Sequence, residues 1–186
     1  MSVNLEFEAK SMLSKQDYEK LAKEFSNPQK YIQTNYYISA KNLSKDVGIR
    51  IRKKYKDFEL TIKVNLGDHK KEINQKISRK SLIFFRIFRI FPKGEVFSYL
   101  IQNRVENLKN LHIIGKMKTT RIDVNFDTSL ISIDKSQYNK LVDYEIECED
   151  SSFPIAETQL IKFLETRNIE YKKSKYSKLA RFINSK

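Results

Sequence analysis

The sequence predicts an α+β protein in which antiparallel β-strands carry one apolar face and one charged face. Successive side chains of a strand point to opposite faces, and apolar residues alternate with charged or polar ones in about eight segments. The few segments with helical periodicity are amphipathic and rich in Phe and Ile, so they could cover the apolar face. Alternation by itself fits either a closed barrel with a charged lumen or an open sheet with a solvated face.

The first strand, expected at 3–10, sets this pattern. Its apolar residues would share one face, while Glu6, Glu8 and Lys10 would share the other. A surface strand with a solvated face would look the same. However, like charges at i, i+2 point in one direction, which is unfavourable unless a counter-ion or charged ligand lies there. Because such pairs recur in later strands, the pattern favours a ligand.

The other elements are expected in the following order. Ser14 is placed to cap a helix at about 15–25, with Asp17 in the capping-box position. Strands follow at about 31–39, 47–55, 57–65 and 70–77, then a Phe- and Ile-rich helix capped by Ser78 and a helix at about 95–104. Strands at about 116–126, 130–135 and 142–149 and helices at about 155–167 and 175–184 complete the chain.

Composition limits the class of protein. A chain of 186 residues is about one domain. One cysteine fits a reducing cytosol, and Met1 leads directly into the first strand, so we expect a cytoplasmic protein without a secretory signal. The most apolar run, Leu82 to Phe91, is too short to span a bilayer and contains two arginines, so it predicts a buried helix. The net charge of +13 permits contact with nucleic acid or an anionic membrane without establishing either.

Seven motifs, in order, resemble those of the CYTH domain, the family of triphosphate tunnel metalloenzymes. Glu6-Phe7-Glu8-Ala9-Lys10 resembles the family's ExExK signature. The other matches are Arg50-Ile51-Arg52 (RxR), Leu60-Thr61-Ile62-Lys63 (LTxK), Glu72, Arg121 after Thr119-Thr120, the acidic motifs Asp134 and Glu145-Ile146-Glu147, and the lysine helix Lys178-Leu179-Ala180-Arg181-Phe182. Asn35-Tyr36-Tyr37 and Asp143-Tyr144-Glu145 resemble the YjbK-like bacterial branch. Ser39 departs from the family, which commonly has an acidic residue near this position.

The resemblance implies a closed eight-stranded antiparallel barrel, a triphosphate tunnel with a charged lumen, formed by residues 1–186 as a single domain. It implies Mg²⁺ or Mn²⁺ as the cofactor, since carboxylate oxygens suit these ions, and basic residues to grip phosphate oxygens. The implied metal ligands are Glu6, Glu8, Glu72, Asp134, Glu145 and Glu147. The implied substrate-binding residues are Lys10, Arg50, Arg52, Lys63, Arg121 and Lys178, although Lys175 competes with Lys178 for the tunnel. The implied catalytic residues are Glu6, Glu8, Lys10, Arg50, Arg52, Lys63 and Glu147.

The activity that follows is metal-dependent hydrolysis of inorganic triphosphate or a nucleoside triphosphate. Three alternatives stay open: an adenylate cyclase, a thiamine triphosphatase, and a non-catalytic module that binds polyphosphate or nucleotide. The expected partner is a small triphosphate, with no membrane and with nucleic acid permitted but not favoured. The expected state is a monomer or homodimer. His69, His112 and Cys148 do not form a plausible zinc site and are expected to be structural or incidental.

Overall fold

The computed structural model of the chain describes residues 3–26, 30–40, 43–67, 69–103 and 108–186. These residues form a closed eight-stranded barrel with the strand order β1-β5-β4-β3-β2-β6-β7-β8, which confirms the predicted fold class. The strands are β1 (Val3–Met12), β2 (Lys30–Ser39), β3 (Val47–Lys54), β4 (Asp57–Asn65), β5 (Lys70–Ile77), β6 (His112–Phe126), β7 (Ser129–Tyr138) and β8 (Leu141–Asp150). The helices are α1 (Lys15–Glu24), α2 (Arg79–Phe88), α3 (Glu95–Gln102), α4 (Phe153–Glu165), α5 (Lys178–Asn184) and the short 3₁₀ helix η1 (Leu108–Asn110).

Serine caps set the starts of three helices. The side chains of Ser14 and Ser78 accept hydrogen bonds from backbone N–H groups three residues later, so α1 and α2 begin where the sequence predicts. Ser177 caps α5 in the same way. The last helix therefore begins at Lys178, three residues later than expected. The helix expected at 95–104 ends at Gln102, and residue 104 lies outside the described residues.

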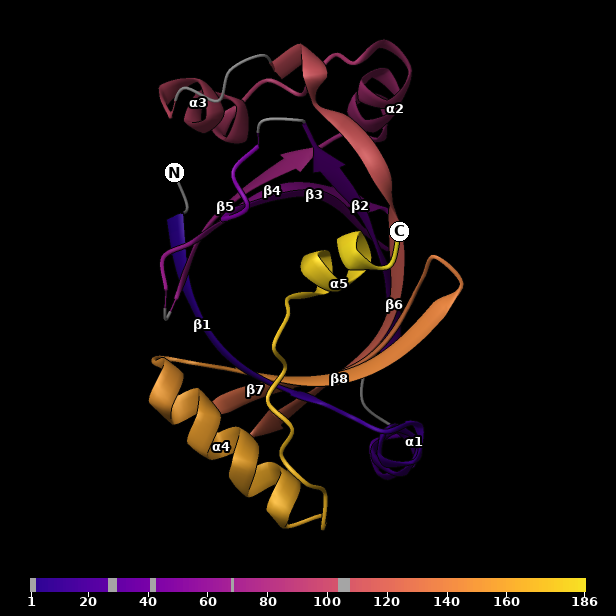
Figure 1. Ribbon diagram of the computed structural model, residues 1–186, viewed down its shortest axis with the longest axis vertical. Coiled ribbons are helices and arrows are strands. Elements are labelled where there is room, and N and C mark those ends of the chain that lie inside the picture. The colour runs from indigo at the N-terminus through magenta and orange to yellow at the C-terminus, as the bar shows by residue number, and fades with distance from the viewer. Residues whose placement is uncertain (1–2, 27–29, 41–42, 68, 104–107) are drawn as a thin grey trace. The chain divides into compact units, whose positions relative to one another are not determined.

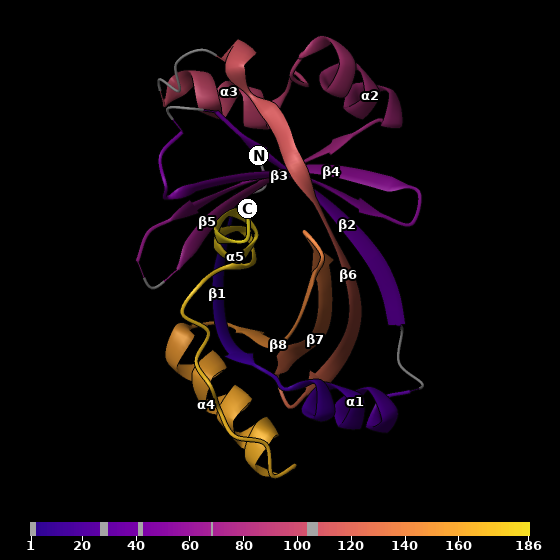
Figure 2. The same cartoon turned by 45° about the vertical axis from the view of Figure 1, so that its right-hand side comes forward.

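The chain divides into two compact units, which are described separately. The second unit comprises Glu6–Ile32 and Lys118–Lys186. Its strands β1, β8, β7 and β6 pair antiparallel in that order. Helices α1 and α4 lie on one face of this sheet and α5 on the other (Figures 1 and 2). Apolar residues of α1, α4 and the strands form one buried core, which includes Leu21, Ile133, Ile146, Leu160 and Phe163. The charged face is therefore the one that α5 approaches.

The first unit comprises Met1–Leu5 and Gln33–Met117. Strands β2, β3, β4 and β5 pair antiparallel, and their apolar face packs with residues of α2 and α3 in a second core that includes Ile51, Leu60, Phe85 and Leu100. Directly paired residues share a face, so Asn35 and Tyr37 of β2 lie on the same face as their partners in the RxR motif of β3, as expected.

The expectation that the Phe- and Ile-rich helix is buried was wrong. In α2 only Leu82 and Phe85 are buried. The neighbouring Ile83, Phe84 and Ile87 are exposed, because a helix lying on a sheet presents a single stripe to it and no described segment covers the other side. None of the helices in the described part of the chain has the length and apolarity needed to cross a membrane.

Candidate functional site

Strand register brings the charged residues of the second unit into rows across the sheet. Glu8 lies opposite Glu149 and Lys10 opposite Glu147 in the β1–β8 pair. In the neighbouring strands Asp134 lies between Arg121 and Glu145. Residues directly opposite in an antiparallel pair have their Cβ atoms about 5 Å apart on one face. The predicted ligands of the first and last strands therefore come together, although they are far apart in the sequence.

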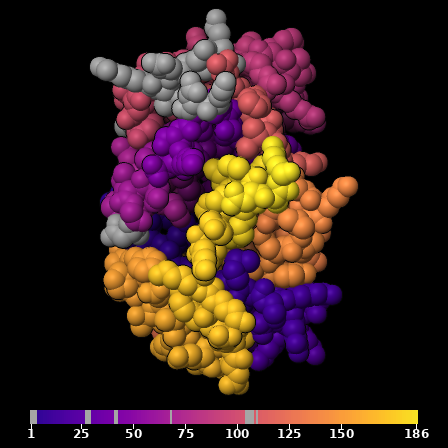
Figure 3. Space-filling view, viewed as in Figure 1, coloured from indigo at the N-terminus to yellow at the C-terminus, as the bar shows by residue number. Residues whose placement is uncertain are grey.

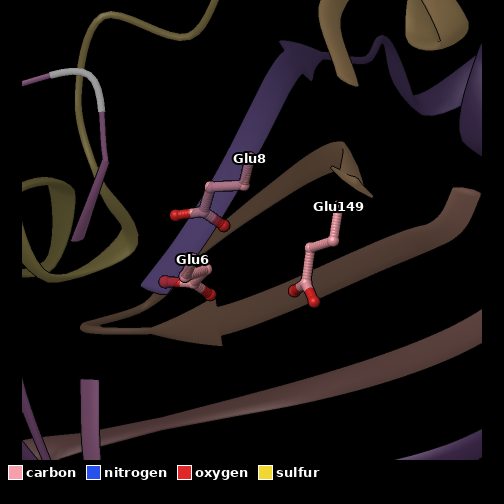
Figure 4. Close-up of side chains that lie close together, drawn as sticks. All are labelled: Glu6, Glu8 and Glu149. Atoms are coloured by element: carbon pink, nitrogen blue, oxygen red, sulfur yellow. The ribbon is translucent and has the colours of Figure 1, made fainter. Parts of the chain in front are cut away.

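The first acidic cluster consists of Glu6, Glu8 and Glu149, each of which is partly buried (Figure 4). One carboxylate oxygen of each lies within 4.8 Å of the others. Burial, together with repulsion from Glu6, Glu147 and Glu8, raises the pKa of Glu149 to about 7. Three carboxylates this close repel one another, and a hard divalent cation would relieve that repulsion. The cluster therefore has the chemistry of an Mg²⁺ or Mn²⁺ site.

Glu149 is a functional candidate that the sequence analysis missed. It continues the i, i+2 series of Glu145 and Glu147 along β8, so the signal was present. The prediction followed the family motif and stopped at Glu147. Pairing with β1 then places Glu149 directly opposite Glu8.

The second acidic cluster consists of Asp134, Glu145 and Glu147, which are all buried. The Nζ atom of Lys178 lies 2.9 Å from Asp134 and 2.8 Å from Glu147, and it also contacts Glu145. The guanidinium of Arg121 donates two hydrogen bonds to Asp134, at 2.8 and 2.6 Å, and one hydrogen bond to Glu147. The charges of this cluster are therefore balanced by basic side chains of the same unit.

The pKa values agree with an ion-pair network. Burial alone would raise the pKa of the Glu147 carboxyl, but Lys10, Lys178 and Arg121 hold it well below its ordinary value. Burial alone would lower the pKa of Lys178, but the carboxylates around this lysine outweigh burial and raise its pKa. The bases likewise lower the pKa of Asp134, whereas at Glu145 burial outweighs them and raises the pKa. The prediction that Asp134, Glu145 and Glu147 bind metal stays a prediction.

Helix α5 supplies a second cation to this network. Arg181 follows Lys178 at the i, i+3 spacing that places two side chains on one face of a helix. Its guanidinium lies 2.8 Å from Asp143 and 2.5 Å from Glu145. Arg181 was not among the predicted site residues, although its spacing from Lys178 is visible in the sequence. Lys175 is exposed, so Lys178 is the lysine that reaches the carboxylates.

The charged face of the first unit is predominantly basic. Glu72 lies 3.5 Å from Arg50 and 3.3 Å from the Nζ atom of Lys63, which is its direct cross-strand partner. Burial raises the pKa of Glu72, but Lys63 and Arg50 outweigh this and lower it. Arg52 donates a hydrogen bond of 3.4 Å to Asn35. Glu72, predicted as a metal ligand, lies among the bases and belongs to neither acidic cluster of the described residues.

The CYTH domain family matches residues 4–183 of the chain. The chain belongs to the CYTH domain family. It is 28% identical over 192 residues to the Bacillus subtilis (strain 168) protein named "Putative triphosphatase YjbK", and the match covers all of this chain and 98% of that protein.

Solved structures have the same fold. A crystal structure described as "a putative adenylate cyclase" from Bacillus halodurans superposes with a TM-score of 0.88 at 27% identity, over 98% of this chain and 99% of that one. A Hippeastrum protein described as a "putative adenylyl cyclase" with "a dominant" triphosphatase activity superposes with a TM-score of 0.84 at 19% identity, over 97% and 96% of the two chains. Both cover nearly the whole CYTH chain.

The raised pKa of Glu149 predicts that the metal-free CYTH protein loses part of its free energy of unfolding as the pH rises. The folded state holds this proton more tightly than the unfolded chain, so the contribution of Glu149 to the free energy of unfolding is highest below the ordinary pKa of Glu. It falls as the pH rises through about 7, by roughly 3 kcal/mol at most. Glu149→Gln should remove this fall, so the variant should melt higher than the wild type at pH 8 but not at pH 4. Thermal melts at pH 4 and pH 8 in a chelating buffer would measure this difference, with Glu19→Gln, at an exposed position of α1, as the control. The same change in melting temperature with pH for the wild type and Glu149→Gln would contradict the prediction.

Proposed function

We propose that this chain is a divalent-metal-dependent triphosphatase that acts on inorganic triphosphate or a nucleoside triphosphate. The observation that carries the proposal is the cluster of Glu6, Glu8 and Glu149, on the charged face of a CYTH barrel. A cytoplasmic location, a small triphosphate as the partner, and a monomeric or dimeric state are part of this proposal. The names of the Bacillus subtilis and Hippeastrum relatives also support triphosphate hydrolysis.

Glu6, Glu8 and Glu149 would hold Mg²⁺ or Mn²⁺ through carboxylate oxygens. When bound, such an ion polarises a phosphoryl oxygen and lowers the pKa of a coordinated water. Lys10 lies 3.0 Å from Glu8 and also pairs with Glu147, so it connects the two acidic clusters. We propose that the second cluster holds its basic partners in position for the substrate, and that it binds a further metal only when those partners move.

The basic residues that we propose for substrate binding are Lys10, Arg50, Arg52, Lys63, Arg121 and Lys178. Arginine guanidinium groups donate paired hydrogen bonds to phosphate oxygens, and lysines add a compact positive charge. The buried Nε atom of Arg50 has no hydrogen-bond partner among the described residues. A buried donor left without a partner is unfavourable, so an anionic oxygen at this position would satisfy it.

Hydrolysis requires less of the protein than the alternatives do. A hydrolase needs a water positioned at a phosphoryl end. A cyclase must also hold adenine and ribose so that the 3′-hydroxyl lies in line with the α-phosphate, within about 3–3.5 Å. Among the described residues we identify no group of side chains that would recognise adenine. The chain also has no Trp to stack on a thiamine ring. We therefore place hydrolysis ahead of cyclisation and of thiamine triphosphate turnover.

The deciding experiment identifies products. Tripolyphosphate, ATP and thiamine triphosphate are each incubated with the protein and Mg²⁺ or Mn²⁺, and released phosphate and nucleotide products are separated by chromatography. We expect orthophosphate, a preference for tripolyphosphate over ATP, and no cyclic AMP. Cyclic AMP and pyrophosphate as main products, with tripolyphosphate left intact, would favour the cyclase. Ligand binding without turnover of any substrate would favour the non-catalytic module.

Removal of metal should abolish the activity. In excess chelator we expect phosphate release to fall at least about a hundredfold, because the ion supplies several kcal/mol of transition-state stabilisation. Addition of Mg²⁺ or Mn²⁺ in excess of the chelator should restore it, whereas Ca²⁺, which prefers more ligands at longer distances, should restore less. Full activity in chelator would contradict the role of metal.

A further inference from the structure

The outer side of α2, together with Ile90 just after the helix, carries large exposed apolar side chains. We call them the α2 patch: Ile83, Phe84, Ile87, Phe88 and Ile90. Ile87 is 62% exposed and Phe88 is 60% exposed. Phe84 and Phe88 are one turn apart and their ring centroids lie 5.6 Å from each other. In Figure 3 the atoms of α2 lie at the surface of the first unit, and no other segment covers them in this view. A contiguous exposed apolar surface of this kind marks an interaction site.

The charged side chains in the segment that carries the α2 patch are all positive. Residues 79–94 contain five basic side chains and no acidic one. The basic residues, which are all exposed, are Arg79, Lys80, Arg86, Arg89 and Lys93. Within α2, Lys80 lies three and four residues before Ile83 and Phe84, and Arg86 lies three residues after Ile83. Positions three and four apart on a helix are neighbours, so both basic side chains lie beside the patch. A partner for this surface must therefore provide both an apolar environment and negative charge.

An anionic lipid surface offers both. A helix with Phe and Ile on its outer side and Arg and Lys among them can bury the apolar groups at the acyl boundary while the basic groups pair with headgroup phosphates. A second copy of the chain would bring five cations against five, which opposes association. Nucleic acid would satisfy the cations, but its phosphate backbone would leave Ile83, Ile87 and Ile90 without a contact.

We propose that the α2 patch docks the protein on the surface of an anionic lipid bilayer. The contact is interfacial, with α2 in the plane of the headgroups, and does not involve a spanning segment. It departs from the expectation from sequence that the protein has no membrane partner. That expectation treated the run from Leu82 to Phe91 as a buried helix, whereas most residues of this run are exposed in the structure. The proposal does not depend on the proposed triphosphatase activity.

The test is sedimentation of the full chain with vesicles of phosphatidylcholine alone or of phosphatidylcholine mixed with phosphatidylglycerol. We expect binding to the mixed vesicles only, weakening as salt rises. Ile87→Gln/Phe88→Gln and Lys80→Gln/Arg86→Gln should each lower the partition coefficient at least about tenfold. The matched controls are Leu66→Gln/Ile155→Gln, which are exposed apolar residues elsewhere, and Lys23→Gln/Lys56→Gln, which are exposed lysines elsewhere.

Two further measurements separate docking from misfolding or self-association. Because the substituted side chains are exposed, both patch variants should keep the melting temperature and the phosphate-release rate of the wild type. Binding of the patch variants equal to that of the controls would overturn the proposal, as would equal binding of the wild type to neutral vesicles. Light scattering that shows a wild-type dimer, monomeric patch variants and no vesicle binding by any of them would overturn it in favour of a second copy.

Discussion

Glu8→Gln and Glu149→Gln should each lower the turnover of tripolyphosphate by about a hundredfold or more at saturating Mg²⁺. Each removes one of three carboxylates whose oxygens lie within 4.8 Å of one another, while leaving the basic residues of both units in place. Loss of metal-based stabilisation worth several kcal/mol corresponds to a factor of this size. Measured phosphate release should therefore fall much more than tripolyphosphate affinity.

Glu19→Gln is the matched control, because it removes the same charge from an exposed position of α1, where Glu19 pairs only with the exposed Lys15 among the described ion pairs. It should turn over substrate like the wild type. Normal turnover in both Glu8→Gln and Glu149→Gln would show that this cluster is not the metal site. A loss in Glu8→Gln alone would keep the site and remove Glu149 from it.

Lys178→Met should lower the free energy of unfolding by about 3–5 kcal/mol. The substitution keeps most of the side-chain volume but leaves Asp134, Glu145 and Glu147 without their shared ammonium group in a buried environment. For a chain of this size, that loss corresponds to a fall in melting temperature of roughly 6–20 °C. Thermal and urea unfolding of the metal-free protein would measure it.

Lys175→Met is the control for this stability prediction, since Lys175 is exposed three residues before Lys178 and its replacement should change the melting temperature little. Equal melting temperatures for the two variants would show that the ion-pair network does not stabilise the fold. Mg²⁺ that stabilises Lys178→Met more than the wild type would support the prediction that this second cluster can bind metal.

The sequence by itself determined the strands, their two faces and the family. Alternation between apolar and charged residues is a local property, because each backbone unit of a strand turns the next side chain to the other face. For that reason the strand expected at 70–77 occurs as Lys70–Ile77, and the faces of β1, β3 and β8 are as predicted. The serines at 14 and 78 determined helix starts for the same local reason, since a cap bonds within its own first turn.

Only the tertiary structure decided which charges meet. Cross-strand register, which is fixed by pairing between distant segments, placed Glu149 opposite Glu8 and Glu72 opposite Lys63. The contact of α5 with β8 decided that Asp134, Glu145 and Glu147 are balanced by Lys178. Packing also decided the exposure of α2, because hydrophobicity along a helix does not say how many of its sides another element covers. Electrostatic partners and covered surface depend on distances between segments, and these exist only once the chain has folded.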